Sequence, residues 1–273
     1  MATAAVTGCF LLALVPLVWI LWTVASRGYH LLLDQHWWLS SQRGITARHV
    51  GGGAYHAIVG TLLQAAVTAA ISVPLAVLTA VYLVEYGRGR LARVVSFMVD
   101  VLSGIPSIVA ALFVYALWVT TLGLDRVAFA VSLSLVLLMV PVVVRSTEEM
   151  LKLVPNELRE ASYALGVPKW RTVSSIVLPT AFSGIVTGVL LGLARVMGET
   201  APLLVLGPYS KSINTDLFSG FMAALPTMIN QDRSEAVDPA VNRVWAAALT
   251  LIILVMLLNI AGRLIARLNK VSK

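Results

Sequence analysis

Arg195 and Glu199 are the residues in this sequence most suited to chemistry, because they lie four positions apart in an otherwise apolar stretch, LARVMGETAPLLVLG, residues 193–207. A charged side chain inside a bilayer is costly and usually faces a protein interior or a water-filled path. On a helix this spacing brings the two side chains within reach of an ion pair. The pair either neutralises itself and fixes helix packing, or it offers the arginine fork to an anion while the glutamate offsets the charge.

The elements that must position this pair have the composition of a membrane protein. Of 273 residues, 59% are hydrophobic and 12% are charged, whereas soluble domains carry about 25% charged residues. A span needs about 20 apolar residues, which predicts six transmembrane helices in an all-α membrane fold. We expect one transmembrane domain, 1–273, without room for a separate soluble domain. The expected spans are 8–25, 57–84, 94–119, 127–144, 180–206 and 244–260.

The basic residues indicate an orientation rather than a nucleic-acid site. The net charge is +7, but lysines and arginines are spread over the loops between the apolar spans. More of them fall on the inner side if both termini are cytoplasmic, as the positive-inside rule favours. The first span could alternatively be a signal peptide, although it lacks a positive segment ahead of its apolar run.

Cysteine and histidine residues predict no metal or cofactor. Cys9 is the single cysteine, so no disulfide can form within the chain. The four histidines, His30, His36, His49 and His56, fall before the second span at spacings that fit no compact metal motif. An ordinary outer loop is expected there. The spans also hold no Ser/His or metal-ligand pair, so we expect no catalytic residues.

The segment 145–180 predicts two short helices but is too polar to cross a bilayer. Pro155 can begin the first helix, Gly166 can end it, and Pro168 can begin a second helix leading into the fifth span. One face of the first helix is apolar, with residues at i, i+3 and i+7: Leu158, Ala161 and Leu165. Such a helix lies on the inner leaflet or docks on a partner protein, and the pattern alone leaves both open.

The spacing in this segment matches the EAA loop of ABC-importer permeases, which reads EAA, three residues, G, nine residues, I-x-L-P. Here Glu160-Ala161-Ser162 is followed at these spacings by Gly166 and by IVLP, residues 176–179. The one departure is Ser162 in place of the second alanine. The sequence therefore resembles type I ABC-importer permeases, with the EAA coupling loop at about 148–179.

The resemblance extends from Arg145 through GETAPLL and is specifically to the PstA family of phosphate importer permeases. The ending GETAPLL resembles this family more than its PstC-like sister permeases, which share the R-x-x-G-E-T core. The resemblance implies a heterodimer with a PstC-like permease, a cytoplasmic ATPase dimer below it, and an extracytoplasmic phosphate-binding protein. It makes the helix carrying Leu158, Glu160 and Ala161, with Gly166 behind it, the ATPase-coupling element. The chain itself has no G-x-x-x-x-G-K-[ST] phosphate loop, so we expect a transport subunit and no enzyme.

Residues of the expected fifth span complete the predicted pathway. Gly184, Gly188 and Gly192 recur every four positions, forming a face along which another helix can approach closely. The resemblance implies that Arg195, Glu199 and Thr200 of the R-x-x-G-E-T motif line the path for phosphate.

Two residues outside the fifth span are further candidates. The resemblance also places Arg145 on the path, although an arginine there could simply anchor the helix at the interface. Asp100, in the third span, is either a partner for a basic residue or lies near the inner interface, and Pro106 marks a bend.

These observations predict half of the translocation path of an ATP-driven phosphate importer, in a bacterial plasma membrane and surrounded by lipid. Two alternatives remain: a permease for another oxyanion such as sulfate or molybdate, and an ion-coupled secondary carrier. The second has no use for an EAA loop.

Overall fold

The computed structural model describes residues 2–268, and within that range all regular structure is helical. Five helices are long and apolar enough to cross a membrane, and a bent pair makes up a sixth candidate span. The predicted all-α membrane fold is thus confirmed. The long helices are α1 (Ala2–Leu32), α3 (Tyr55–Val81), α6 (Ala128–Lys152), α9 (Leu178–Met197) and α12 (Asp238–Leu268).

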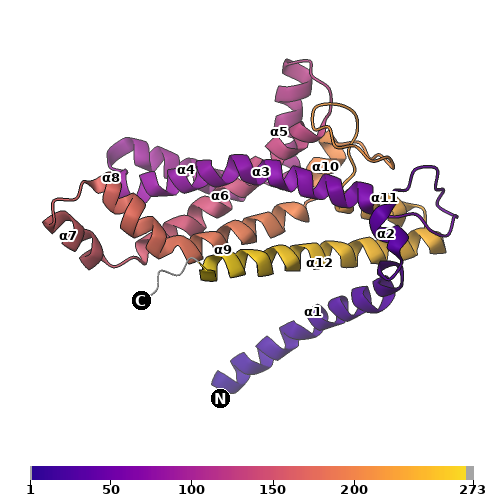
Figure 1. Cartoon of the computed structure of the whole chain (residues 1–273), viewed down its shortest axis with the longest axis horizontal. Coiled ribbons are helices and arrows are strands. Elements are labelled where there is room, and N and C mark those ends of the chain that lie inside the picture. The colour runs from indigo at the N-terminus through magenta and orange to yellow at the C-terminus, as the bar shows by residue number, and fades with distance from the viewer. Residues whose placement is uncertain (1, 269–273) are drawn as a thin grey trace.

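The expected third span is two helices instead of one. α4 (Gly89–Gly104) is followed by α5 (Ser107–Tyr115), which continues as a π-helical turn, η2 (Ala116–Thr121). The chain bends by 106° between α4 and the segment Ser107–Thr121. The break falls at Ile105 and Pro106, whose ψ angles of 128° and 140° are those of extended backbone. Proline disfavours helical backbone in the residue before it, so α4 ends there. Pro106 therefore does more than bend a span: it turns the axis of α5 far out of line with α4 (Figure 1).

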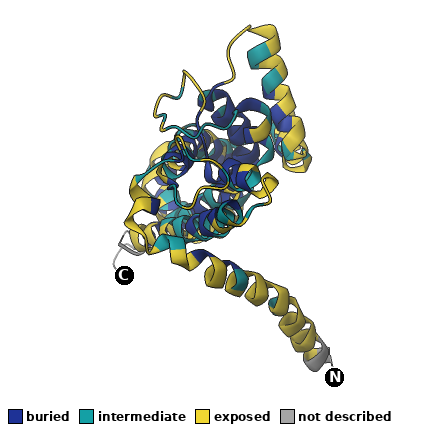
Figure 2. Ribbon diagram, turned by 90° about the vertical axis from the view of Figure 1, so that its right-hand side faces the viewer, coloured by how far each residue is buried: buried dark blue, intermediate teal, exposed yellow. Residues whose placement is uncertain are grey.

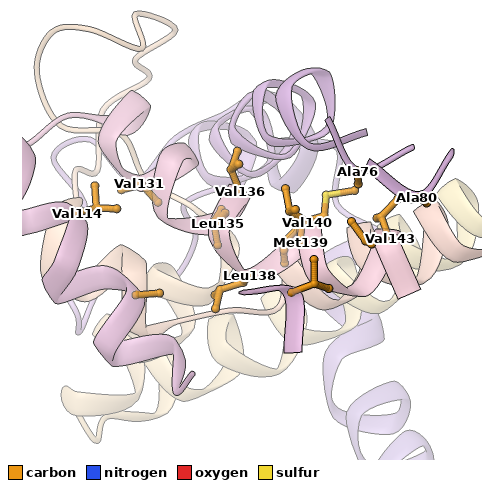
Figure 3. Close-up of a cluster of buried hydrophobic side chains, with 14 of the residues drawn as sticks. Ala76, Ala80, Val114, Val131, Leu135, Val136, Leu138, Met139, Val140 and Val143 are labelled. Carbon is orange, nitrogen blue, oxygen red and sulfur yellow. The ribbon is translucent and has the colours of Figure 1, made fainter. Parts of the chain in front are cut away.

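α6 lies at the centre of the molecule and packs against α3, α9, α4, α5 and α10 (Ala201–Leu206). Its apolar side chains are buried along nearly its whole length. Figure 3 shows its residues from Val131 to Val143 meeting Ala76 and Ala80 of α3 and Val114 of α5. The alanines on α3 allow the two helix backbones to approach closely. This packing fixes where the charged residues at the ends of α6 and α9 lie.

A smaller core joins the loop-bearing ends of the helices. Trp37 of α2 (Gln35–Leu39) packs with Leu225 and Met228 of α11 (Leu225–Ser234) and with alanines of α3 and α12. Its indole N–H donates to Thr250 Oγ1 of α12 at 2.9 Å. The segment before α3 is therefore held in place rather than loosely attached.

α1 leaves the rest of the molecule along its N-terminal half, where nearly all side chains from Val6 to Trp22 are exposed (Figure 2). It contacts α12 near its other end, where a Cβ on Gly28 would lie 2.6 Å from the Trp245 carbonyl oxygen. The start of α1, the end of α12 and the loop around α7 (Asn156–Ala164) lie toward the same end of the molecule (Figure 1). Counting the bent pair as one span gives six candidate spans among residues 2–268, an even number that agrees with this placement.

Candidate functional site

The glycine face of α9 is filled by α6. A Cβ on Gly184 would overlap Met150, and one on Gly188 would overlap the Ser146 hydroxyl. One on Gly192 would lie 3.2 Å from Val143 Cγ2. The close helix approach predicted from the small residues is thus present, and the neighbour is α6.

The R-x-x-G-E-T motif lies at a break between helices. α9 ends at Met197, with Gly198 as its C-terminal cap, and α10 begins after Thr200. The expected continuous span 180–206 is therefore wrong beyond residue 197. Glycine has a low helix propensity, and Pro202 lacks the N–H that a continuing helix would use. Thr200, a predicted pathway residue, is the N-cap of the short helix α10.

Arg195 and Glu199 still face each other across this break. Arg195 Nε lies 3.8 Å from Glu199 Oε1, with side-chain exposures of 51% and 18%. This distance allows an ion pair but exceeds hydrogen-bond length. Among residues 2–268, no acceptor lies within hydrogen-bond distance of the Arg195 guanidinium. Its fork is therefore available to a further anion.

Arg145 is in a different situation, because two carboxylates already bind it. Nη1 donates to Glu148 Oε2 at 2.6 Å, and Nη2 forms a short contact with Asp100 Oδ1. Nη2 also donates to Ser96 Oγ at 3.0 Å. Asp100 thus serves as the partner of a basic residue. With one cation and two anions, this cluster does not attract an anion in its present arrangement.

The loop between α6 and α9 has the predicted shape. α7 ends at Ala164, Gly166 adopts φ +75°, and α8 (Lys169–Thr172) continues through a π-helical turn, η3 (Val173–Val177), into α9. A positive φ is readily adopted only by glycine, so the sharp turn depends on Gly166.

The outer surface of α7 has no partner within the described chain. Leu158 is half-exposed, Leu165 is 83% exposed, and Glu160 and Ala161 are also exposed. Ser162 instead points inward, and its hydroxyl lies 2.8 Å from Thr172 Oγ1. This bond between the two short helices gives a reason for serine where the EAA pattern has alanine.

One functional candidate was missed by the sequence reasoning. Arg159 of α7 pairs with Glu85, which lies in the π-helical turn η1 (Tyr82–Tyr86) at the end of α3, with Arg159 Nη2 2.8 Å from Glu85 Oε1. Both side chains are largely buried. The only sequence signal was Glu85 itself, an acidic residue closing an apolar span.

The histidines do not share one loop, contrary to expectation. His30 lies in α1 and His36 in α2, while His56 is buried at the start of α3. His56 Nε2 lies 3.1 Å from the Tyr209 hydroxyl. Across residues 2–268, no group of three or more potential metal ligands comes together.

A buried polar network surrounds His56. The Tyr209 hydroxyl donates to Gln42 at 2.7 Å, Gln42 donates to Asp232 at 2.8 Å, and Arg243 pairs with Asp232 at 3.1 Å. Burial raises the pKa of Tyr209, since the phenolate would be desolvated. The phenol therefore stays a hydrogen-bond donor, and the network ties the segment before α3 to α11 and α12.

Comparisons with known proteins agree on one class of protein. Residues 72–270 match the family model described as "Binding-protein-dependent transport system inner membrane component". The chain is 59% identical over 256 residues to the phosphate transport system permease protein PstA 1 of Mycobacterium tuberculosis (strain CDC 1551 / Oshkosh), covering 94% of this chain and 84% of that protein. It is 41% identical over 250 residues to PstA of Yersinia pestis, covering 91% and 83%.

Solved structures share the fold at low sequence identity. A bacterial alginate ABC transporter bound to a periplasmic protein aligns with TM-score 0.68 and 13% identity, covering 100% of this chain and 96% of that one. The inward-facing MetNI methionine ABC transporter aligns with TM-score 0.61 and 23% identity, covering 80% and 94%.

Proposed function

The chain belongs to the family of binding-protein-dependent transport system inner membrane components, and we propose that its cargo is inorganic phosphate. The observation that carries this proposal is the half-exposed guanidinium of Arg195, held 3.8 Å from Glu199 at the break between α9 and α10. The names of the mycobacterial and Yersinia relatives support phosphate as the cargo.

Arg195 is suited to a passing oxyanion because its planar fork can donate two parallel hydrogen bonds to phosphate oxygens. Glu199 offsets the positive charge when no cargo is present. It also prevents binding so tight that release would stall, since a transport path needs entry that is favourable and exit that is possible. Thr200, beside Glu199, supplies a hydroxyl for the same cargo.

Arg145 contributes later on the path in this proposal. Its partner Asp100 is largely exposed, whereas Glu148 is buried beside it. Separation of α4 from α6 would release Asp100 and leave Arg145 with one carboxylate, a neutral pair like Arg195 and Glu199. Arg145 would then accept an anion only when the helices part.

The family implies that the chain works with an ATPase and a substrate-binding protein, and we propose the following partners. A PstC-like permease would complete the path, and an extracytoplasmic protein would deliver phosphate. A cytoplasmic ATPase dimer would receive the exposed face of α7, with Leu158, Glu160 and Ala161 at the contact and Gly166 setting its angle. We infer from this arrangement that the α7 loop and both termini are cytoplasmic and that the ATPase binds the nucleotide. Residues 1–273 act as one permease domain.

Phosphate uptake by cells with and without this chain tests the proposal. Labelled phosphate is supplied alone and with excess sulfate or molybdate, and ATPase co-purification is measured in the same cells. Uptake that depends on the chain and resists both competitors supports a phosphate importer. Equal competition by sulfate would identify a general oxyanion permease, and uptake by the chain without any ATPase would identify a secondary carrier.

A further inference from the structure

Glu85 and Arg159 form a buried connection between two segments that are 74 positions apart. Arg159 Nη2 and Nε donate to Glu85 Oε1 at 2.8 and 3.1 Å. The side chains are 5% and 13% exposed, although most of α7 is exposed. A charged pair in this setting is costly to break, because either partner left alone would be an unpaired buried charge. The two segments are therefore firmly held together.

The same guanidinium also binds the end of α6. Nη1 donates to the Val154 carbonyl at 2.6 Å, and Nη2 donates to the Leu151 carbonyl at 3.0 Å. The last carbonyls of a helix have no partner within it, and a cation there is favoured by the helix dipole. Arg159 thus joins three elements: α7, which carries it, the end of α6, and the end of α3.

Lys169 makes a second attachment to the end of α3, from the far side of the Gly166 turn. Its ammonium group forms a short contact with the Glu85 carbonyl oxygen and lies 5.0 Å above the centre of the Tyr86 ring. The π-helical turn η1 is consequently held from α7 by Arg159 and from α8 by Lys169. α3 is not adjacent to this loop in the sequence, whereas α6 and α9 directly flank it.

We propose that Glu85 and Arg159 are positioning residues that transmit displacement of α7 to α3 during transport. α7 is joined to α6 by the short segment 153–155 and to α9 through α8 and η3, so those spans follow it through the chain itself. α3 has no such link, and a forked, charge-assisted hydrogen bond resists pulling as well as pushing. The ion pair makes α3 move with the loop. This inference rests on the proposed function, since it assigns a role within the ATP-driven cycle.

The test uses the complete importer, purified with its ATPase and reconstituted in liposomes. Phosphate uptake and ATP hydrolysis are measured together in Glu85→Gln, Arg159→Lys and the double variant Glu85→Gln/Arg159→Gln. The double variant leaves no unpaired buried charge, so it separates loss of the connection from misfolding. Arg171→Gln is the matched control, because Arg171 lies in the same loop, is exposed, and stacks on Trp170. Its guanidinium forms no hydrogen bond or ion pair with α3 within residues 2–268.

The expected result is an assembled complex that still hydrolyses ATP but carries less phosphate per ATP. Energetic couplings between distant sites commonly correspond to about 5- to 150-fold, so a fall of about fivefold or more is expected in the double variant. Arg171→Gln should match the parent.

Two outcomes would overturn the inference. An unchanged ratio of phosphate to ATP in the double variant would show that α3 follows α7 without this pair. Loss of assembled complex in all three variants would show that the pair only supports folding. The proposed function is judged separately, on the parent: ATP hydrolysis without phosphate uptake there would overturn it and this role with it.

Discussion

Gly188 of α9 lies against Ser146 of α6 so closely that a methyl group on the glycine would overlap the serine hydroxyl. Arg145, one position before Ser146, and Glu148, two positions after it, form an ion pair beside this contact. The glycine face therefore determines how near the charged residues of the two helices can come, and packing and the proposed transport path depend on the same contact.

Enlarging Gly188 should separate α6 from α9. We expect Gly188→Val to destabilise the permease by about 1–3 kcal/mol, the usual cost of overpacking a close contact. Thermal unfolding of the detergent-purified protein measures this. Gly8→Val is the control, since a Cβ at Gly8 of α1 meets nothing within 4 Å. Equal melting temperatures for both variants would contradict the close packing of α9 on α6.

Removing the charge of Arg195 should stop transport without preventing assembly. Arg195 is half-exposed and makes only a long ion pair, so Arg195→Gln should change stability by less than about 1 kcal/mol, as for exposed ion pairs. Phosphate uptake should fall to the background of cells lacking the chain. Arg195→Lys, which keeps the charge but not the fork, should retain partial uptake. Normal uptake by Arg195→Gln would favour the interpretation of Arg195 and Glu199 as a packing pair.

A side chain at Gly166 should weaken ATPase docking through the backbone. Gly166 has φ +75°, a conformation that costs other residues roughly 1–2 kcal/mol. Gly166→Val should therefore reorient α7 and reduce the amount of ATPase that co-purifies, as should Glu160→Lys by reversing a charge on the exposed face. Gly123→Val is the matched control, because Gly123 has φ +66° and open space around it, and it precedes α6 whereas α7 follows α6. ATPase recovery that falls equally with Gly123→Val would show that any strained turn has this effect.

The two possible roles of Arg145 can be separated with a double variant. Arg145→Gln leaves the buried Glu148 without its cation, and an unsatisfied buried group costs about 1–3 kcal/mol. Arg145→Gln/Glu148→Gln removes both charges and should regain most of that stability. If Arg145 contacts the cargo, the double variant should assemble normally but transport phosphate at least about tenfold more slowly. A tenfold slower rate corresponds to an activation free energy higher by about 1.4 kcal/mol. Full transport by the double variant would make Arg145 a structural residue.

The local elements of this protein could be predicted from sequence alone. Apolar length predicted the spans because a helix must present about 20 such residues to lipid. Gly166 predicted the turn after α7, and Gly184, Gly188 and Gly192 predicted a close helix contact. The loop pattern around Glu160 also predicted the family, since those residues are close together in the chain. Each of these properties depends on neighbours within one or two helical turns.

The breaks and the ion pairs depended on the tertiary structure. The sequence did not predict the end of α9 at Met197. The run 193–207 is apolar on both sides of that point, and hydropathy alone does not indicate where a helix ends. The pairing of Arg195 with Glu199 could be predicted, because the two residues are four positions apart. Sequence could not show that Arg145 is held by Asp100 or that Arg159 is held by Glu85. Those partners come from different helices, and only the packing of α3 and α4 against α6 and its loop brings them together.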